Sequence, residues 1–209
     1  MRIAVINETS AADRNADILS ALEGRGHQVF NAGLTKNGGQ PELTYIHTGL
    51  MAALLLHLNR VDFVVGGCGT GQGFLNAVMQ YPGVVCAHIL TPLDAWLFTQ
   101  INGGNCVALM LNQGYGWAAD VNLRMIFDAL FSVESGSGYP PHRRESQQHS
   151  RLVLQQVSQS AHKSFARILA ALPAEVAQPA ISYPAFLPLL DPDTLADRSL
   201  AAAIQKWLD

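Results

Sequence analysis

A thiol and a hydroxyl lie within one glycine-rich segment, where both could act on a bound anion. Cys68 and Thr70 are surrounded by glycines at positions 66, 67, 69, 71 and 73. Glycine allows positive φ, so successive backbone N–H groups can converge on one point. An apolar run from Phe63 to Val65 precedes the loop and a helical pattern starts at Phe74. Because a helix N-terminus adds partial positive charge, the segment predicts a cradle for a phosphate, a carboxylate or an enediolate.

Two widespread phosphate-binding motifs do not fit this loop. No Gly-Lys-Ser/Thr follows it, as a Walker loop requires. The spacing of Gly69, Gly71 and Gly73 is shorter than G-x-G-x-x-G, and the loop follows a later strand. A nicotinamide dehydrogenase is set aside because no glycine motif follows the first strand. The alternative for the loop is a turn that needs glycine only for its geometry, but five glycines in eight residues exceed what one turn requires.

The elements around the loop alternate between strands and helices. Apolar runs predict strands at Arg2–Ile6, His27–Asn31, Val61–Val65, Val84–Ile89 and Cys106–Met110. Helical spacing between them includes a long helix from about Glu42, a helix opened by Thr91-Pro92 and another from about Trp117 to Phe131. This alternation predicts an α/β fold, a three-layer αβα Rossmann-like arrangement with a five-stranded parallel sheet.

Ligands of such sheets bind beyond the carboxyl ends of the strands. We therefore expect three segments to converge there: Asn7 to Ser10, Cys68 to Gly73, and the region of Asn102.

The chain after residue 145 changes character. A helix is predicted from about Ser146 to Leu172, and prolines at 173, 179, 184, 188 and 192 exclude a long helix beyond it. A last short helix is expected from about Leu195 to Leu208. The predicted division is an α/β domain at 1–145 and a C-terminal helical extension at 146–209, used for packing or oligomerisation.

Composition excludes several classes of protein. The 209 residues are 49 % hydrophobic and 14 % charged with a net charge of −3, which argues against a nucleic-acid partner. No apolar run reaches the roughly 18 residues of a membrane span, and no signal peptide is evident. The three cysteines are odd in number and lack metal spacing, and with no signal peptide we expect reduced thiols in a cytoplasmic protein. No cofactor is expected. Cys86 and Cys106 lie inside apolar strands and are interpreted as core residues.

At this point the sequence resembles a known family. The opening strand, the loop Gly67–Gly73, the Pro92 helix, Asn102 and the run Asn105–Leu109 resemble the type B ribose-5-phosphate isomerases, which include the galactose-6-phosphate isomerase subunits. The resemblance covers about residues 1–145, and the tail is similar to that of a longer branch of sugar-phosphate isomerases.

The resemblance implies an aldose–ketose isomerase that uses no metal. By this resemblance Cys68 takes a proton from the carbon beside the carbonyl, which gives an enediolate. Thr70 relays protons or holds substrate oxygens. The N–H groups of the loop from Gly69 through Gly71 to Gly73 stabilise the oxyanion.

The sequence departs from the family at two histidines. Glu8-Thr9 stands where the family has Asp-His, so Asn7 and Glu8 can still bind substrate hydroxyls but the phosphate-contacting histidine is absent. Ile101-Asn102 stands where the family has His-Asn, so the ring-opening histidine is absent while Asn102 could bind a substrate oxygen. The basic residues His142, Arg143 and Arg144 fall near those that bind phosphate in a neighbouring subunit's site of the family. A solvated basic loop is the alternative for these three.

These departures leave two substrates open, a pentose phosphate and an open-chain tetrulose phosphate. Ile101 favours the open chain, because a phosphate on C4 prevents a tetrulose from closing a ring through that hydroxyl. His88 is a candidate ring-opening group if it lies at the end of its strand, and otherwise a satisfied core histidine. The alternative function is a non-catalytic sugar-phosphate-binding protein or a partner-dependent isomerase subunit, against which Cys68 argues. The family's shared sites predict a homodimer or homotetramer.

Overall fold

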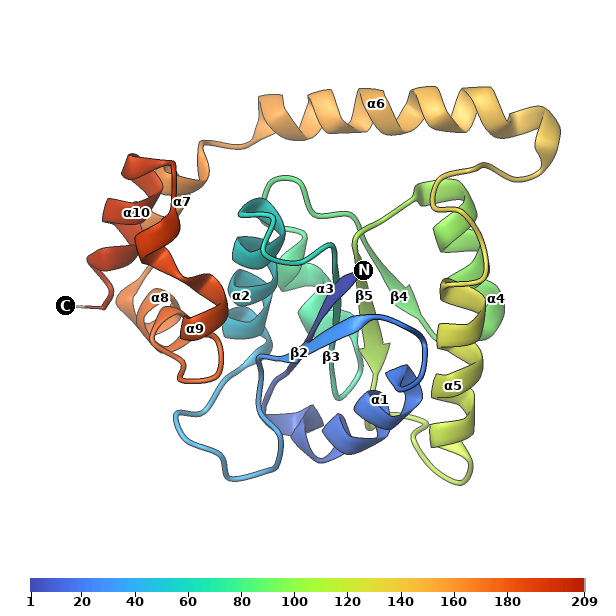
Figure 1. The fold of residues 1–209 in the computed structure, drawn as a ribbon, viewed down its shortest axis with the longest axis horizontal. Coiled ribbons are helices and arrows are strands. Elements are labelled where there is room, and N and C mark those ends of the chain that lie inside the picture. The colour runs from blue at the N-terminus through green and yellow to red at the C-terminus, as the bar shows by residue number, and fades with distance from the viewer. Residues whose placement is uncertain (209) are drawn as a thin grey trace.

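The computed structural model describes residues 1–208 and is built on one wholly parallel sheet (Figure 1). The strands lie in the order β2-β1-β3-β5-β4. Their bounds are β1 Arg2–Asn7, β2 Gln28–Asn31, β3 Phe63–Cys68, β4 Cys86–Ile89 and β5 Cys106–Met110. The predicted α/β class and the five parallel strands are confirmed. The third strand runs farther than expected, because the first glycines of the predicted loop pair with β1 and β5.

The register brings three strand ends side by side. Asn7 of β1 pairs with Gly67 of β3, and Cys68 pairs with Met110 of β5. After β1 the chain adds β2 on one side of it and β3 on the other side. The switch point of the topology therefore lies between β1 and β3. Ligands of open parallel sheets bind at such a point, beyond the carboxyl ends.

Helices cover both faces of the sheet, which makes the three predicted layers. Helices α2 (Tyr45–His57) and α3 (Gln72–Val78) pack on one face and share a buried cluster that includes Leu50, Leu54 and Phe74. On the other face lie the 3-10 turn η1 (Thr9–Arg14), α1 (Asn15–Leu22), α4 (Pro92–Leu97) and α5 (Ala119–Leu130). The predicted threonine cap is confirmed, because Thr91 Oγ1 accepts a hydrogen bond of 3.2 Å from Asp94 N. Helix α4 continues into the π-helical turn η2 (Phe98–Asn102).

The single helix predicted from Ser146 to Leu172 is wrong. The chain forms η3 (Pro141–Arg143), α6 (Arg144–Ala161) and α7 (Phe165–Ala171), with extended backbone at His162 between the two helices. His162 Nδ1 lies 2.8 Å from the carbonyl oxygen of Ser158 and closes α6. Phe165 then packs against the rings of Tyr81 and His57. These tertiary contacts break a helical sequence pattern that has no local interruption.

The remaining tail is a set of short helices, as its prolines predict. They are α8 (Ala174–Ile181), α9 (Leu187–Leu190), the 3-10 turn η4 (Pro192–Thr194) and α10 (Arg198–Gln205), the last of which is shorter than expected. Figure 1 shows α7 to α10 gathered beside α2. Ile181, Phe186 and Leu200 are buried in the same apolar cluster as α2.

Helix α6 lies apart from both groups. Figure 1 shows it running across the top of the view, from the side of α4 and α5 to the group formed by α7 to α10. Gly83 N, in the loop before β4, donates to Ser158 Oγ at 3.4 Å, so α6 passes over the amino edge of the sheet. None of its residues is buried, and Leu152, Val153, Leu154 and Val157 are exposed. Among residues 1–208, no helix has both the length and the apolarity to cross a bilayer.

Candidate active site

Cys68 is the last residue of β3 and stands at the switch point of the sheet. Its side chain is 5 % exposed, and Sγ lies 3.9 Å from Thr70 Oγ1. Thr70 itself is exposed. The structure therefore brings the predicted thiol and hydroxyl together at the carboxyl edge of the sheet.

Backbone hydrogen bonds fix the loop that carries the thiol. The carbonyl of Cys68 accepts from Gly71 N at 3.2 Å and from Leu111 N at 3.1 Å. The carbonyl of Gly69 accepts from Asn112 N at 3.0 Å and from Gln113 N at 2.9 Å. The loop is thus bound to the segment that follows β5, and these two carbonyl oxygens are engaged in hydrogen bonds.

Two of the N–H groups expected to face a substrate are already engaged. Gly69 N donates to Ser10 Oγ at 3.0 Å, and Gly71 N donates to the carbonyl of Cys68. The expectation that these two glycines stabilise an oxyanion through their N–H groups is therefore wrong for this loop conformation. The N–H groups of Thr70 and Gly73 have no acceptor among residues 1–208. Gly73 lies in the first turn of α3, where the helix dipole favours negative charge.

Glu8 acts on the loop through a serine. The Glu8 side chain is 5 % exposed, and its Oε1 accepts a short hydrogen bond from Ser10 Oγ. The same hydroxyl oxygen accepts the hydrogen bond from Gly69 N, so a carboxylate, a hydroxyl and a loop amide form one chain. Asn112 Nδ2 donates to the carbonyl of Ser10 at 2.6 Å and ties β5 to this arrangement.

Asn7 is enclosed at the end of β1. Its side chain is fully buried, and neither Nδ2 nor Oδ1 has a hydrogen-bond partner among residues 1–208. Buried amides in native proteins are nearly always paired, so this residue retains two unused polar atoms. Asn7 pairs with Gly67, and strand alternation directs its side chain to the α1 face, opposite to that of Cys68.

Asn102 and the basic cluster are not brought to Cys68 within one chain. Helix α4 leaves the carboxyl end of β4 and returns, so that η2 ends before β5 begins, at the amino edge. His142, Arg143 and Arg144 are exposed at the start of α6, which contacts η2. The expected convergence of Asn102 with Cys68 is therefore wrong for a single chain, because the two lie at opposite ends of the sheet.

The two other cysteines lie away from this edge. Cys106 is fully buried in β5, directly opposite Cys86. Burial raises the pKa of the Cys106 thiol well above its usual range, and the neighbouring Cys86 adds to the effect. A thiol held neutral in this way is a core residue and no base.

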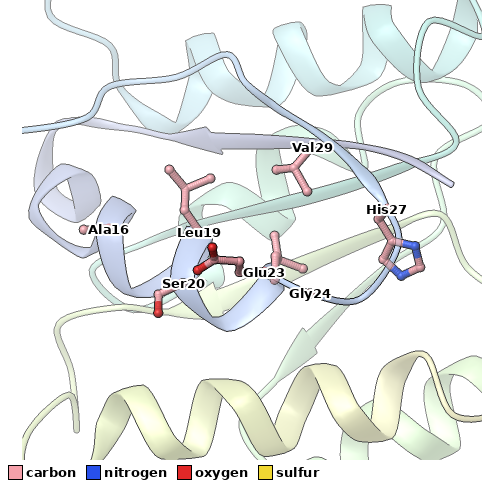
Figure 2. A pocket seen from close by; sticks show the side chains of 8 residues that line it. Ala16, Leu19, Ser20, Glu23, Gly24, His27 and Val29 are labelled. Atoms are coloured by element: carbon pink, nitrogen blue, oxygen red, sulfur yellow. The ribbon is translucent and has the colours of Figure 1, made fainter.

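A separate hollow of about 570 Å³ lies beside α1 and β2 (Figure 2). Its lining comprises Ala16, Leu19, Ser20, Leu22, Glu23, Gly24, His27 and Val29. Neither Cys68 nor Glu8 lines it, and β2 is the outer strand of the sheet. The hollow is therefore no part of the candidate site.

Comparison with known proteins agrees with the geometry. A family model described as Ribose/Galactose Isomerase matches residues 3–139. The chain belongs to this family. No curated protein sequence matches the chain.

Two solved structures resemble this ribose/galactose isomerase over the full chain. One is 4-deoxy-L-threo-5-hexosulose-uronate ketol-isomerase in complex with a tartrate, at 34 % identity and a TM-score of 0.91, with 100 % of each chain covered. The other is ribose-5-phosphate isomerase from Vibrio parahaemolyticus, at 39 % identity and a TM-score of 0.92, with 99 % of each chain covered. A Clostridium thermocellum ribose-5-phosphate isomerase B shares the fold at 21 % identity and a TM-score of 0.61, over 78 % of this chain and 100 % of that one. The protein is thus an enzyme of the sugar isomerases, which are intramolecular oxidoreductases.

Sequence reasoning placed Ser10 in a segment expected at the carboxyl edge but gave it no role, and it missed Arg151. Ser10 follows Glu8 by two positions, and the 3-10 turn η1 brings its hydroxyl to both Glu8 and Gly69. Arg151 on α6 places its guanidinium against Gly103 and Gly136. A Cβ on Gly103 would lie 2.7 Å from Nη1, and a Cβ on Gly136 would lie 1.2 Å from it. Both glycines have positive φ, and Arg151 Nη1 is buried without a partner among residues 1–208. The two glycines, Gly103 and Gly136, were the sequence feature that could have indicated a close contact. Their positions in the sequence do not show that Arg151 is the residue in contact with them.

Proposed function

We propose that this chain is an aldose–ketose isomerase that acts on a small, open-chain, anionic sugar with Cys68 as the base. The observation that carries the proposal is the position of Cys68. Its thiol ends β3 at the switch point, 3.9 Å from the hydroxyl of Thr70 and beside N–H groups that have no acceptor in residues 1–208.

The chemistry follows from these groups. The Cys68 thiolate removes a proton from the carbon beside the carbonyl, and the electron pair moves onto the carbonyl oxygen to form an enediolate. The N–H groups of Thr70 and Gly73 donate to that oxygen, where charge develops during the reaction. The Thr70 hydroxyl carries a proton between the two oxygens. Cys68 then returns its proton to the neighbouring carbon, which balances the reaction without an external oxidant or reductant.

The substrate class is argued from Ile101 and from the solved relatives. An isoleucine cannot transfer the proton that opens a cyclic sugar, so a substrate that is already open fits this chain. Among the similar structures, one is named for a hexosulose uronate and one for ribose 5-phosphate, and both compounds carry an anionic end. An open-chain sugar phosphate or sugar acid is therefore the proposed substrate.

A second copy of the chain is proposed to complete the site. Asn102, the basic residues His142, Arg143 and Arg144, and Arg151 all lie at the amino edge, remote from their own Cys68. They are proposed to hold the anionic end of a sugar bound to Cys68 of the partner. The exposed apolar side chains of α6 support an extension that serves oligomerisation. The proposed state is a homodimer or a homotetramer.

Solvent deuterium exchange tests the proposed function. Wild type, Cys68→Ala and Cys86→Ala would be incubated in D2O with ribose 5-phosphate, erythrulose 4-phosphate and 4-deoxy-L-threo-5-hexosulose uronate. We expect exchange beside the carbonyl of an open-chain substrate, reduced by at least about a hundredfold in Cys68→Ala and unchanged in Cys86→Ala. Equal exchange in wild type and Cys68→Ala contradicts the role of Cys68. Efficient turnover of ribose 5-phosphate alone contradicts the open-chain assignment.

A further inference from the structure

His88 lies on the same face of the sheet as Cys68. It pairs with Ala108 of β5, which in turn pairs with Gly66, two residues before Cys68. Side chains two residues apart on a strand point to one face. Cys68 and Ala108 accordingly share the buried cluster beneath α3. His88 is the next-to-last residue of β4, close to the carboxyl edge.

The imidazole occupies the space beside Gly71 of the Cys68 loop. A Cβ on Gly71 would lie 2.6 Å from His88 Nε2 and 2.7 Å from Cδ2, so only glycine fits against this ring. Gly71 has a φ of 76° and caps α3. Its N–H donates to the Cys68 carbonyl. The ring thus contacts the residue that connects the thiol to the start of the helix.

The Nε2 atom is buried and has no hydrogen-bond partner among residues 1–208. A satisfied core histidine, the alternative for this position, is therefore not what the structure shows. An unpaired buried polar atom destabilises the fold, whereas leucine would fill similar space without that cost. A ring nitrogen held unpaired beside a reactive loop indicates a hydrogen bond that forms in another state of that loop.

We propose that His88 is a positioning residue of the isomerase reaction. Its Nε2 hydrogen-bonds to the Cys68 loop when an anionic sugar binds there, and so holds the thiol and the N–H groups of Thr70 and Gly73 in place. The inference rests on the proposed function, in which this loop binds the substrate. It also gives a second reason why residue 71 is glycine. Besides its positive φ, the residue must leave room for the imidazole of His88.

His88→Leu and His88→Gln test this role together. The side-chain amide of glutamine can place an N–H near the position of Nε2, while leucine only fills space. We expect His88→Leu to lower kcat at least about tenfold with little change in KM, the size of effect of one lost hydrogen bond. His88→Gln should recover part of kcat. The thermal midpoint of His88→Leu should equal or exceed that of wild type, which separates the effect from misfolding.

Cys86→Ala serves as the matched control, because Cys86 lies in the same strand two residues away. A His88→Leu variant with wild-type kcat overturns the inference, and so does a His88→Gln variant as impaired as His88→Leu. If Cys68→Ala abolishes exchange while His88→Leu does not affect it, only the inference fails. If wild type exchanges no sugar, the proposed function fails, and nitrogen NMR of the imidazoles with erythronate 4-phosphate decides the inference. An Nε2 resonance of His88 that does not move then refutes it.

Discussion

At the residue scale, the hydrogen bonds of Ser10 decide which loop amides remain for a substrate. Its hydroxyl donates to Glu8 and accepts from Gly69 N, so it transmits the position of a nearly buried carboxylate to the loop. With Gly69 and Gly71 engaged, the N–H groups of Thr70 and Gly73 are the donors that we propose for the enediolate. Preorganised donors cost no rearrangement during the reaction, so we expect each donor held in a fixed direction to contribute to the rate.

Ser10→Ala should therefore impair turnover more than stability. Without the hydroxyl, Gly69 N loses its acceptor and Glu8 loses its donor, so the loop is less well held. We expect kcat/KM to fall about tenfold, as for one hydrogen bond lost in the transition state. Ser182→Ala is the control, because Ser182 Oγ bonds only within its own helical segment, to Gln178 O at 2.7 Å. Equal kcat/KM in the two variants would show that Ser10 does not support the loop.

At this scale the sequence was sufficient to place Cys68 and Thr70 side by side in one loop, because five glycines around a thiol form a local signal. It was insufficient for Arg151, which lies 48 and 15 positions from the two glycines that admit it, Gly103 and Gly136. It was also misleading for Gly69 and Gly71. Whether a loop N–H is free depends on hydrogen-bond partners from distant parts of the chain. Ser10, which accepts from Gly69 N, follows the end of β1.

At the element scale, the strands were predictable and their order was not. Alternating apolar runs and glycine-rich turns fix each strand locally, whereas the order β2-β1-β3-β5-β4 depends on contacts between distant segments. Asn102 shows the consequence. A crossover helix that starts at the carboxyl edge must end at the amino edge, so a residue at the end of η2 cannot reach Cys68 of its own chain.

Arg60 connects the elements of the sheet domain to those of the tail. Its Nε donates to Leu190 O at 3.1 Å and its Nη2 donates to Asp191 O at 2.7 Å. Arg60→Ala should lower the free energy of unfolding in urea by roughly 1–3 kcal/mol, because two carbonyls lose a charged donor. Arg124→Ala, which removes an exposed ion pair with Asp120, should cost less than about 1 kcal/mol. A loss no larger than that of Arg124→Ala would argue that Arg60 does not anchor the tail.

His57 makes the same junction sensitive to acid. It ends α2, its ring lies 4.8 Å from that of Phe165, and burial lowers its pKa below the usual 6.5, partly opposed by Asp197. Between pH 6.5 and the lowered value, the unfolded chain binds a proton that the folded chain does not. Stability should therefore be full above about pH 6.5 and fall as the pH decreases through this window.

Urea unfolding at pH 7.5 and pH 5.5 checks this dependence. We expect His57→Gln to lose less stability than wild type between the two pH values, because it cannot take up the proton. His27, whose pKa is lowered by burial, by the N-terminal charge and by Arg25, contributes in the same direction. The double variant His57→Gln with His27→Gln should show the smallest difference in unfolding free energy between the two pH values. A drop in His57→Gln as large as in wild type would exclude this histidine as a source of acid sensitivity.

At the scale of the whole molecule, the positions of Cys68 and Asn102 at opposite edges require that two chains share each site, if both residues act on one substrate. A mixture of two inactive variants then restores activity. Cys68→Ala removes the base, and Asn102→Asp places a negative charge against an anionic substrate. In a dimer that pairs both variants, one site has both lesions and the other has neither.

Co-expression of the two variants makes this prediction quantitative. Random pairing gives half mixed dimers with one intact site of two, so we expect about a quarter of wild-type kcat, while each variant alone stays inactive. The doubly substituted chain, Cys68→Ala with Asn102→Asp, is the control and should recover nothing when expressed with either single variant. A light-scattering mass equal to one 22.5 kDa chain, or no recovery in a demonstrated mixed dimer, would contradict the shared site. Recovery would also support the role proposed for the amino edge, because Asn102 at that edge would then act on a sugar bound to Cys68 of the partner.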